Sequence, residues 1–76
     1  TNQANKLEVV MAPMPGKVLE LLVEESTAVK EGEPILILEA MKMQNHIYSP
    51  TTAKISELRV KEGQTVKTGE ILATFQ

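Results

Sequence analysis

Short apolar groups recur along the chain, and turn residues separate them. The groups span residues 9–11, 18–23, 35–38, 47–48, 55–60 and 71–73. They are rich in β-branched residues and too short for helices, so each predicts a strand. Glycine and proline between the groups indicate turns, because glycine readily adopts positive φ and proline cannot continue a ladder. About eight short strands at this spacing predict an all-β sandwich or barrel.

An internal repeat organises these strands. A shift of 37 positions aligns residues 7–39 with residues 44–76 without a gap, and ten of the 33 pairs are identical. Two copies are too few for a solenoid, which needs about three or more. The repeat therefore predicts a closed, pseudo-two-fold domain in which each half covers the apolar face of the other.

One irregularity occurs at the same place in both copies. From Val18 to Leu21, and again from Ile55 to Leu58, the apolar residues are three positions apart, which breaks the alternation of a strand. A β-bulge would bring both positions of each pair to the same face. The alternative, in which Val18 and Ile55 belong to a different face, stays open at this point.

Composition limits the function. The 76 residues suffice for one domain, and 42% hydrophobic with 24% charged residues is typical of a globular chain. A net charge of −2 and only two aromatic residues, Tyr48 and Phe75, argue against nucleic-acid binding. No apolar run approaches the length of a membrane span. Cysteine and aspartate are absent and His46 is the single histidine, so we predict neither catalytic nor metal-binding residues.

The four residues between the copies, 40–43, read Ala-Met-Lys-Met. So short a link between antiparallel neighbours predicts a hairpin. The link lacks the Gly, Asn, Asp and Pro that make such turns easy. A local rule broken without an obvious structural gain suggests a functional site. Lys42 would then project from a protruding loop with its amine in solvent.

These residues resemble a known motif. Residues 39–43, Glu-Ala-Met-Lys-Met, are similar to the biotin attachment motif of biotin carboxyl carrier domains, within the biotin/lipoyl attachment superfamily. Residues 12–16 and 60–66 extend the resemblance, which covers about 9–75. It implies a flattened eight-strand barrel-sandwich hybrid with Lys42 at a hairpin tip. We expect residues 7–76 to form this domain and residues 1–6 to be a disordered or linker end.

The resemblance also implies a function. Lys42 would be biotinylated by a biotin protein ligase, and the biotin arm would carry a carboxyl group between biotin carboxylase and carboxyltransferase or decarboxylase sites. The domain would be a non-catalytic carrier that positions a covalent cofactor. A tether raises the effective concentration of that cofactor. The implied location is the cytoplasm, or the mitochondrial matrix for a domain from a eukaryotic carboxylase.

The residues around Lys42 each have two interpretations. Unbranched, polarisable Met41 and Met43 would give the ligase and carboxylase partners an adaptable surface, which we favour. Strand alternation would place both opposite Lys42, so partial packing onto the sheet is a compatible second role. Ala40 belongs to the same motif. Glu39 is either a solvated strand residue or a ligase contact.

The chain departs from the family pattern in two places. Carrier domains commonly have glycine at the positions of Ser26 and Ala53, whereas the repeat mates Gly63 and Gly16 are glycines. If positive φ is required, the cost is about 1 kcal/mol. Residues 23–29 match 60–66 without the insertion of bacterial acetyl-CoA carboxylase carriers. A propionyl-CoA, pyruvate or methylcrotonyl-CoA carboxylase, or a sodium-pumping decarboxylase, fits better.

Two alternatives remain. A lipoyl carrier domain of a 2-oxo acid dehydrogenase complex shares the fold, but usually has an acidic residue before its lysine and a small apolar residue after it. Methionine on both sides of Lys42 favours biotin. An unmodified barrel-hybrid adaptor would keep the repeat without the lysine chemistry. Gln44, His46 and Tyr48, which follow the tip, are interpreted as strand-surface residues.

Overall fold

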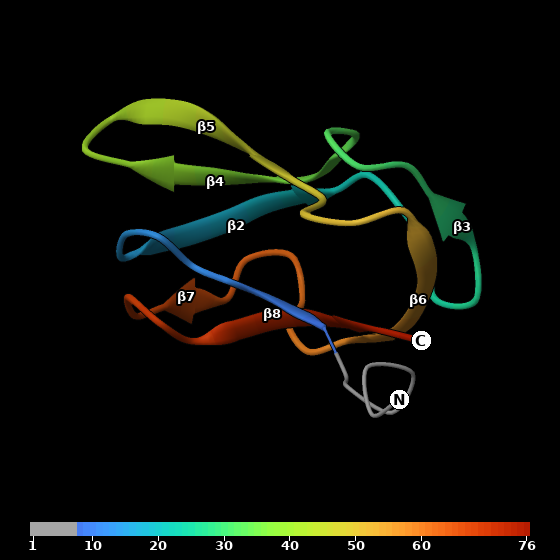
Figure 1. Ribbon diagram of the computed structural model, residues 1–76. Coiled ribbons are helices and arrows are strands. Elements are labelled where there is room, and N and C mark those ends of the chain that lie inside the picture. The colour runs from blue at the N-terminus through green and yellow to red at the C-terminus, as the bar shows by residue number, and fades with distance from the viewer. Residues whose placement is uncertain (1–7) are drawn as a thin grey trace.

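A computed structural model describes residues 8–76, and these form an all-β domain (Figure 1). The expected linker end at residues 1–6 lies outside the described residues. Between residues 8 and 76 no helix is long and apolar enough to cross a membrane.

Eight strands form two four-stranded antiparallel sheets. The strands are β1 (Val9–Met11), β2 (Gly16–Leu21), β3 (Ala28–Val29), β4 (Pro34–Ala40), β5 (Met43–Tyr48), β6 (Ala53–Leu58), β7 (Thr65–Val66) and β8 (Ile71–Phe75). One sheet has the order β1-β8-β6-β3 and the other β5-β4-β2-β7. The strands expected from the apolar groups are confirmed. The two-residue strands β3 and β7 have too few apolar positions to be separated from turns by pattern alone.

The sheet order confirms the pseudo-two-fold symmetry. When 37 is added to each residue number, β1, β2, β3 and β4 fall on β5, β6, β7 and β8. The same correspondence converts the order β1-β8-β6-β3 of one sheet into the order β5-β4-β2-β7 of the other. The loop hydrogen bonds follow the same rule. The Ala12 amide donates to the Glu70 carbonyl at 2.9 Å, and the Ser49 amide donates to the Glu33 carbonyl at 2.8 Å. The two copies therefore have the same fold and exchange the same contacts.

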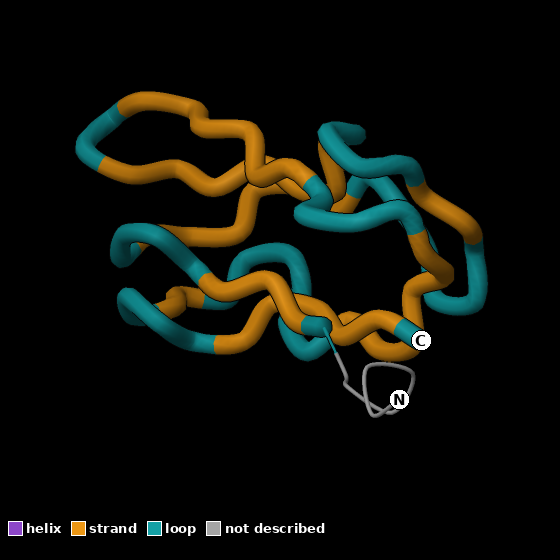
Figure 2. The backbone as a smooth tube through the Cα atoms, in the orientation of Figure 1, coloured by secondary structure: helices purple, strands orange, loops and turns teal. Residues whose placement is uncertain are grey.

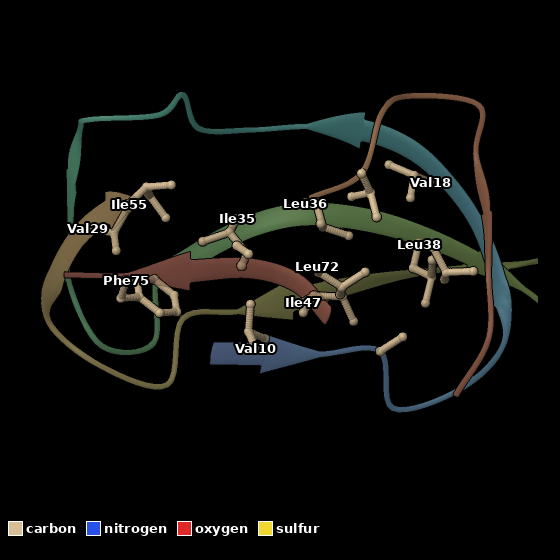
Figure 3. Packing of buried hydrophobic residues seen from close by; sticks show 14 residues of the cluster. Val10, Val18, Val29, Ile35, Leu36, Leu38, Ile47, Ile55, Leu72 and Phe75 are labelled. Atoms are coloured by element: carbon tan, nitrogen blue, oxygen red, sulfur yellow. The ribbon is translucent and has the colours of Figure 1, made fainter. Parts of the chain in front are cut away.

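The hydrophobic core lies between the two sheets, and both copies supply it (Figure 3). The largest fully buried side chains are Phe75, Ile35, Leu36, Leu38, Ile55, Leu72, Val18 and Val66. Burial of a side chain of this size contributes roughly 1.5–3 kcal/mol. Since these residues come from both halves, neither half could bury its apolar face alone.

The β-bulge is confirmed in both copies. Between β2 and β4 the register shifts after Val18, and between β6 and β8 it shifts after Ile55. Val18 and Ile55 are fully buried, while Leu21 and Leu58 pack against the same core. The alternative that placed Val18 and Ile55 on another face is wrong.

Two carboxylates join the halves reciprocally. The Leu21 amide donates to Glu62 Oε2 at 3.0 Å, and the Leu58 amide donates to Glu25 Oε2 at 2.9 Å. Each glutamate therefore satisfies a backbone donor just after the bulge of the opposite copy. At the ends of the described chain, the Phe75 amide donates to the Glu8 carbonyl at 3.0 Å.

The expected backbone strain occurs at one of the two departures from the family pattern. Ser26 has a φ of 71°, and its mate Gly63 has a φ of 89°. Neither Ala53 nor Gly16 is among the residues with positive φ, so this source of strain does not arise at Ala53. Ser26 holds its conformation while its amide donates to the Ile55 carbonyl at 2.8 Å.

We expect Glu25→Ala and Glu62→Ala each to lower the free energy of unfolding by about 1 kcal/mol, because each leaves a backbone amide without its acceptor. Glu→Gln at either position should cost less, since the carboxamide oxygen still accepts. Urea denaturation measures both effects, with the exposed Glu31→Ala as control. Equal losses for alanine and glutamine would contradict the role of the carboxylate oxygen.

A reciprocal exchange tests the strain at the turn residue. Ser26→Gly should raise the free energy of unfolding by up to about 1 kcal/mol, because glycine accepts positive φ at no steric cost. Gly63→Ser should lower it by about the same amount, since an added Cβ there meets no atom within 4 Å and only the backbone opposes it. Thermal or urea unfolding measures both, and changes of the same sign would contradict this account.

Candidate functional site

The β4–β5 hairpin extends to one end of the molecule, where its turn forms the tip (Figure 2). The ladder of β4 and β5 continues to the pair Ala40 and Met43, so the turn consists of Met41 and Lys42 alone. The expected four-residue link is therefore a two-residue turn, because Ala40 and Met43 belong to the strands. Lys42 lies at the tip, as the sequence predicted.

The turn has an unfavourable backbone. Met41 has a φ of 54° and Lys42 a φ of 65°. Positive φ at both central residues is characteristic of the type I′ turn, which usually takes Asn-Gly. For residues with a Cβ this conformation costs roughly 1–2 kcal/mol each. The strain persists because the strands on both sides of the turn are paired along the whole hairpin.

Side chains at the tip are open to solvent. Met41 is 93% exposed, Met43 is 65% exposed, and Lys42 is also exposed. The expected partial packing of Met41 onto the sheet is wrong, because strand alternation does not continue through a turn. Lys42 makes no ion pair with residues 8–76, where Arg59 and Glu57 form the one salt bridge.

The two motif residues before the turn differ in burial. Ala40 is 7% exposed and closes the inner face of β4, whereas Glu39 is exposed on the outer face. The small Ala40 thus ends the core directly below the tip. The exposure of Glu39 is compatible with both interpretations given above.

Asn45 supports the turn from below, a role that the sequence did not indicate. Its side-chain amide donates to the Met43 carbonyl at 3.2 Å and to the Leu38 carbonyl at 3.4 Å. Leu38 and Asn45 are partners in the ladder, so the amide braces the hairpin three residues below the turn. Its position after the tip could have suggested this, since asparagine readily bonds to nearby backbone.

The outer face of β5 carries an aromatic pair. The rings of His46 and Tyr48 stack with centroids 6.2 Å apart and an interplanar angle of 22°. Both are exposed, as is Gln44, which confirms that these three residues lie on the strand surface. The spacing of two along a strand places 46 and 48 on one face, and the sequence could have indicated the pair on that basis.

The site thus offers a single primary amine at the tip of a narrow, strained hairpin, between two exposed thioethers. A partner enzyme can approach this amine without displacing the core. The arrangement suits an attachment point for a group that must enter the active site of another protein.

Comparison with known proteins identifies the family. The family described as "Biotin-requiring enzyme" matches residues 8–75. The chain belongs to this family, and it is similar to biotin carboxyl carrier proteins.

Two individual relatives are similar to this chain over more than half of its length. Over 43 residues, 57% of the chain, it is 63% identical to the methylmalonyl-CoA decarboxylase subunit gamma of Veillonella parvula. Over 44 residues, 58% of the chain, it is 48% identical to the biotin carboxyl carrier protein of Streptococcus mutans. These matches span 33% and 34% of the relatives' lengths.

A solved structure confirms the architecture. A single-chain, multi-domain long-chain acyl-CoA carboxylase superposes with a TM-score of 0.85 at 32% identity. The superposition covers 91% of this chain and 7% of the carboxylase. The predicted fold class, an all-β barrel-sandwich hybrid of eight strands, is therefore confirmed.

We expect Met41→Asn to raise the free energy of unfolding by about 1 kcal/mol, because asparagine tolerates positive φ better than methionine does. Urea denaturation measures the gain. The matched control is Met43→Asn, which lies in β5, is not among the residues with positive φ and should give no gain. Equal effects at both positions would contradict a cause in the turn backbone.

Proposed function

We propose that Lys42 is the residue of this carrier domain to which a biotin protein ligase attaches biotin. The observation that carries the proposal is the position of Lys42 in a two-residue turn at the tip of the hairpin, between Met41 and Met43. The family match supports biotin as the cofactor. The amine of Lys42 would form an amide with the carboxyl group of biotin.

The exposed tip suits this group. Biotin, once attached, supplies the ureido nitrogen that accepts and releases a carboxyl group. The chain's own residues present it: the hairpin holds the attachment point away from the core, and Ala40 leaves no bulky side chain below the turn. Amide formation removes the charge of Lys42 and takes the net charge from −2 to −3. A neutral tip enters a partner's pocket at a lower desolvation cost than an ammonium group.

We further propose that the domain is non-catalytic and delivers the carboxyl group between a biotin carboxylase site and a carboxyltransferase or decarboxylase site. The names of the relatives, a decarboxylase subunit and a carboxyl carrier protein, support partners of this kind. Met41 and Met43 would provide an adaptable apolar contact for the ligase and for these enzymes. The expected location stays the cytoplasm, or the mitochondrial matrix for a eukaryotic parent enzyme.

Intact-mass measurement after co-expression with a biotin ligase tests the attachment site. We expect one biotinyl increment on the unaltered chain and none on Lys42→Ala. Lys17→Ala and Lys54→Ala, a repeat-related pair of exposed lysines, are the matched controls and should keep the increment. Modification of another lysine, or no modification of the unaltered chain, would contradict the proposal. Lipoylation in place of biotinylation would favour the lipoyl alternative.

A further inference from the structure

Gly16 lies where β2 meets the base of the tip hairpin. A Cβ at Gly16 would overlap the carbonyl oxygen of Glu39. It would also lie 3.2 Å from the Glu39 carbonyl carbon and 3.1 Å from Leu38 Cγ. A backbone atom cannot yield as the end of a flexible side chain can, so any larger residue would push β2 and β4 apart at Glu39.

Backbone conformation does not explain this glycine. The glycines with positive φ are Gly32, Gly63 and Gly69, and Gly16 is not among them. The pseudo-two-fold symmetry supplies an internal comparison. Gly16 pairs with Val66 in the β2–β7 ladder, and Ala53 pairs with Val29 at the equivalent place in the β6–β3 ladder. Because Ala53 carries a methyl group there, this strand pairing does not require glycine.

β4 continues through Glu39 to Ala40, the last residue before the turn. Glu39 and Ala40 therefore connect the body of the sheet to the tip of the hairpin. The pair of Lys17 with Glu39 is the last registered contact between β2 and β4 on this side. Gly16 is the neighbouring residue of β2, and Glu39 precedes Lys42 by three residues.

We propose that Gly16 is a positioning residue for Lys42. Without a side chain, β2 approaches the Glu39 carbonyl closely and holds the base of the hairpin in a fixed direction. The close approach of β2 also helps the β4–β5 ladder to hold Met41 and Lys42 in their strained turn conformation. The consequence for modification rests on the proposed function of Lys42, whereas the effect on the hairpin does not.

Three variants separate this role from general destabilisation. Gly16→Ala adds the overlapping methyl group at the hairpin. Gly32→Ala is the control for stability, because its φ of +88° strains the backbone while the new Cβ meets nothing within 4 Å. Gly32 precedes β4 and so lies at the opposite end of that strand from the tip. Ala53→Gly is the control for position, since it alters the symmetry mate of Gly16.

Two measurements are made on each variant under conditions where circular dichroism shows the domain to be folded. Amide hydrogen exchange on the unmodified domain reports the hairpin directly. We expect exchange at Ala40, Met43 and Asn45 to be about tenfold faster in Gly16→Ala than in Gly32→Ala, because the strands above Glu39 separate more often. The kcat/KM for biotinylation should fall about tenfold in Gly16→Ala, because misplacement of the reacting Lys42 amine is costly. It should stay unchanged in both controls.

Unchanged exchange at the hairpin in Gly16→Ala, or an equal loss of kcat/KM in Gly32→Ala, would overturn the proposal and leave the function of Lys42 intact. Loss of the whole fold in Gly16→Ala would also overturn it, because the glycine would then be required by the sheets and not by the hairpin. Failure of the unaltered chain to accept biotin would instead overturn the attachment site. In that case the exchange data still decide whether Gly16 holds the hairpin.

Discussion

The fold depends on the mutual burial of two apolar faces that neither half can cover alone. Each sheet combines strands of both copies, and the bulges of β2 and β6 turn Val18 and Ile55 into one common core. The carboxylates of Glu25 and Glu62 then satisfy donors across the same boundary. Because the halves cannot separate without exposing this core, the strands form a rigid base, and a strained turn can be maintained on it.

The proposed attachment site lies between the two copies. The repeat accounts for both sheets and for most loop contacts, whereas residues 40–43 between the copies form the end of β4, the turn and the start of β5. Gly16 and Ala53 occupy equivalent places in the two copies, and the glycine is the one that lies against the Glu39 carbonyl at the base of the hairpin.

Several features could be predicted from the sequence because they depend on local pattern: the strands with clear apolar groups, the repeat, the bulge and Lys42 at a tip. Others depend on contacts between distant segments. The turn consists of Met41 and Lys42 alone because the ladder extends through Ala40 and Met43, and the apolar pattern does not show that these two residues pair. The strands β3 and β7 are too short to show a period. The reason for Gly16 requires knowing which carbonyl lies opposite it.

The hydrogen bond between the Phe75 amide and the Glu8 carbonyl places the two ends of the described chain side by side, and in Figure 1 they lie in the half of the molecule away from the tip. In a longer polypeptide, both connections would therefore leave from the same side of the domain. When the domain turns about these connections, Lys42 at the tip would move furthest.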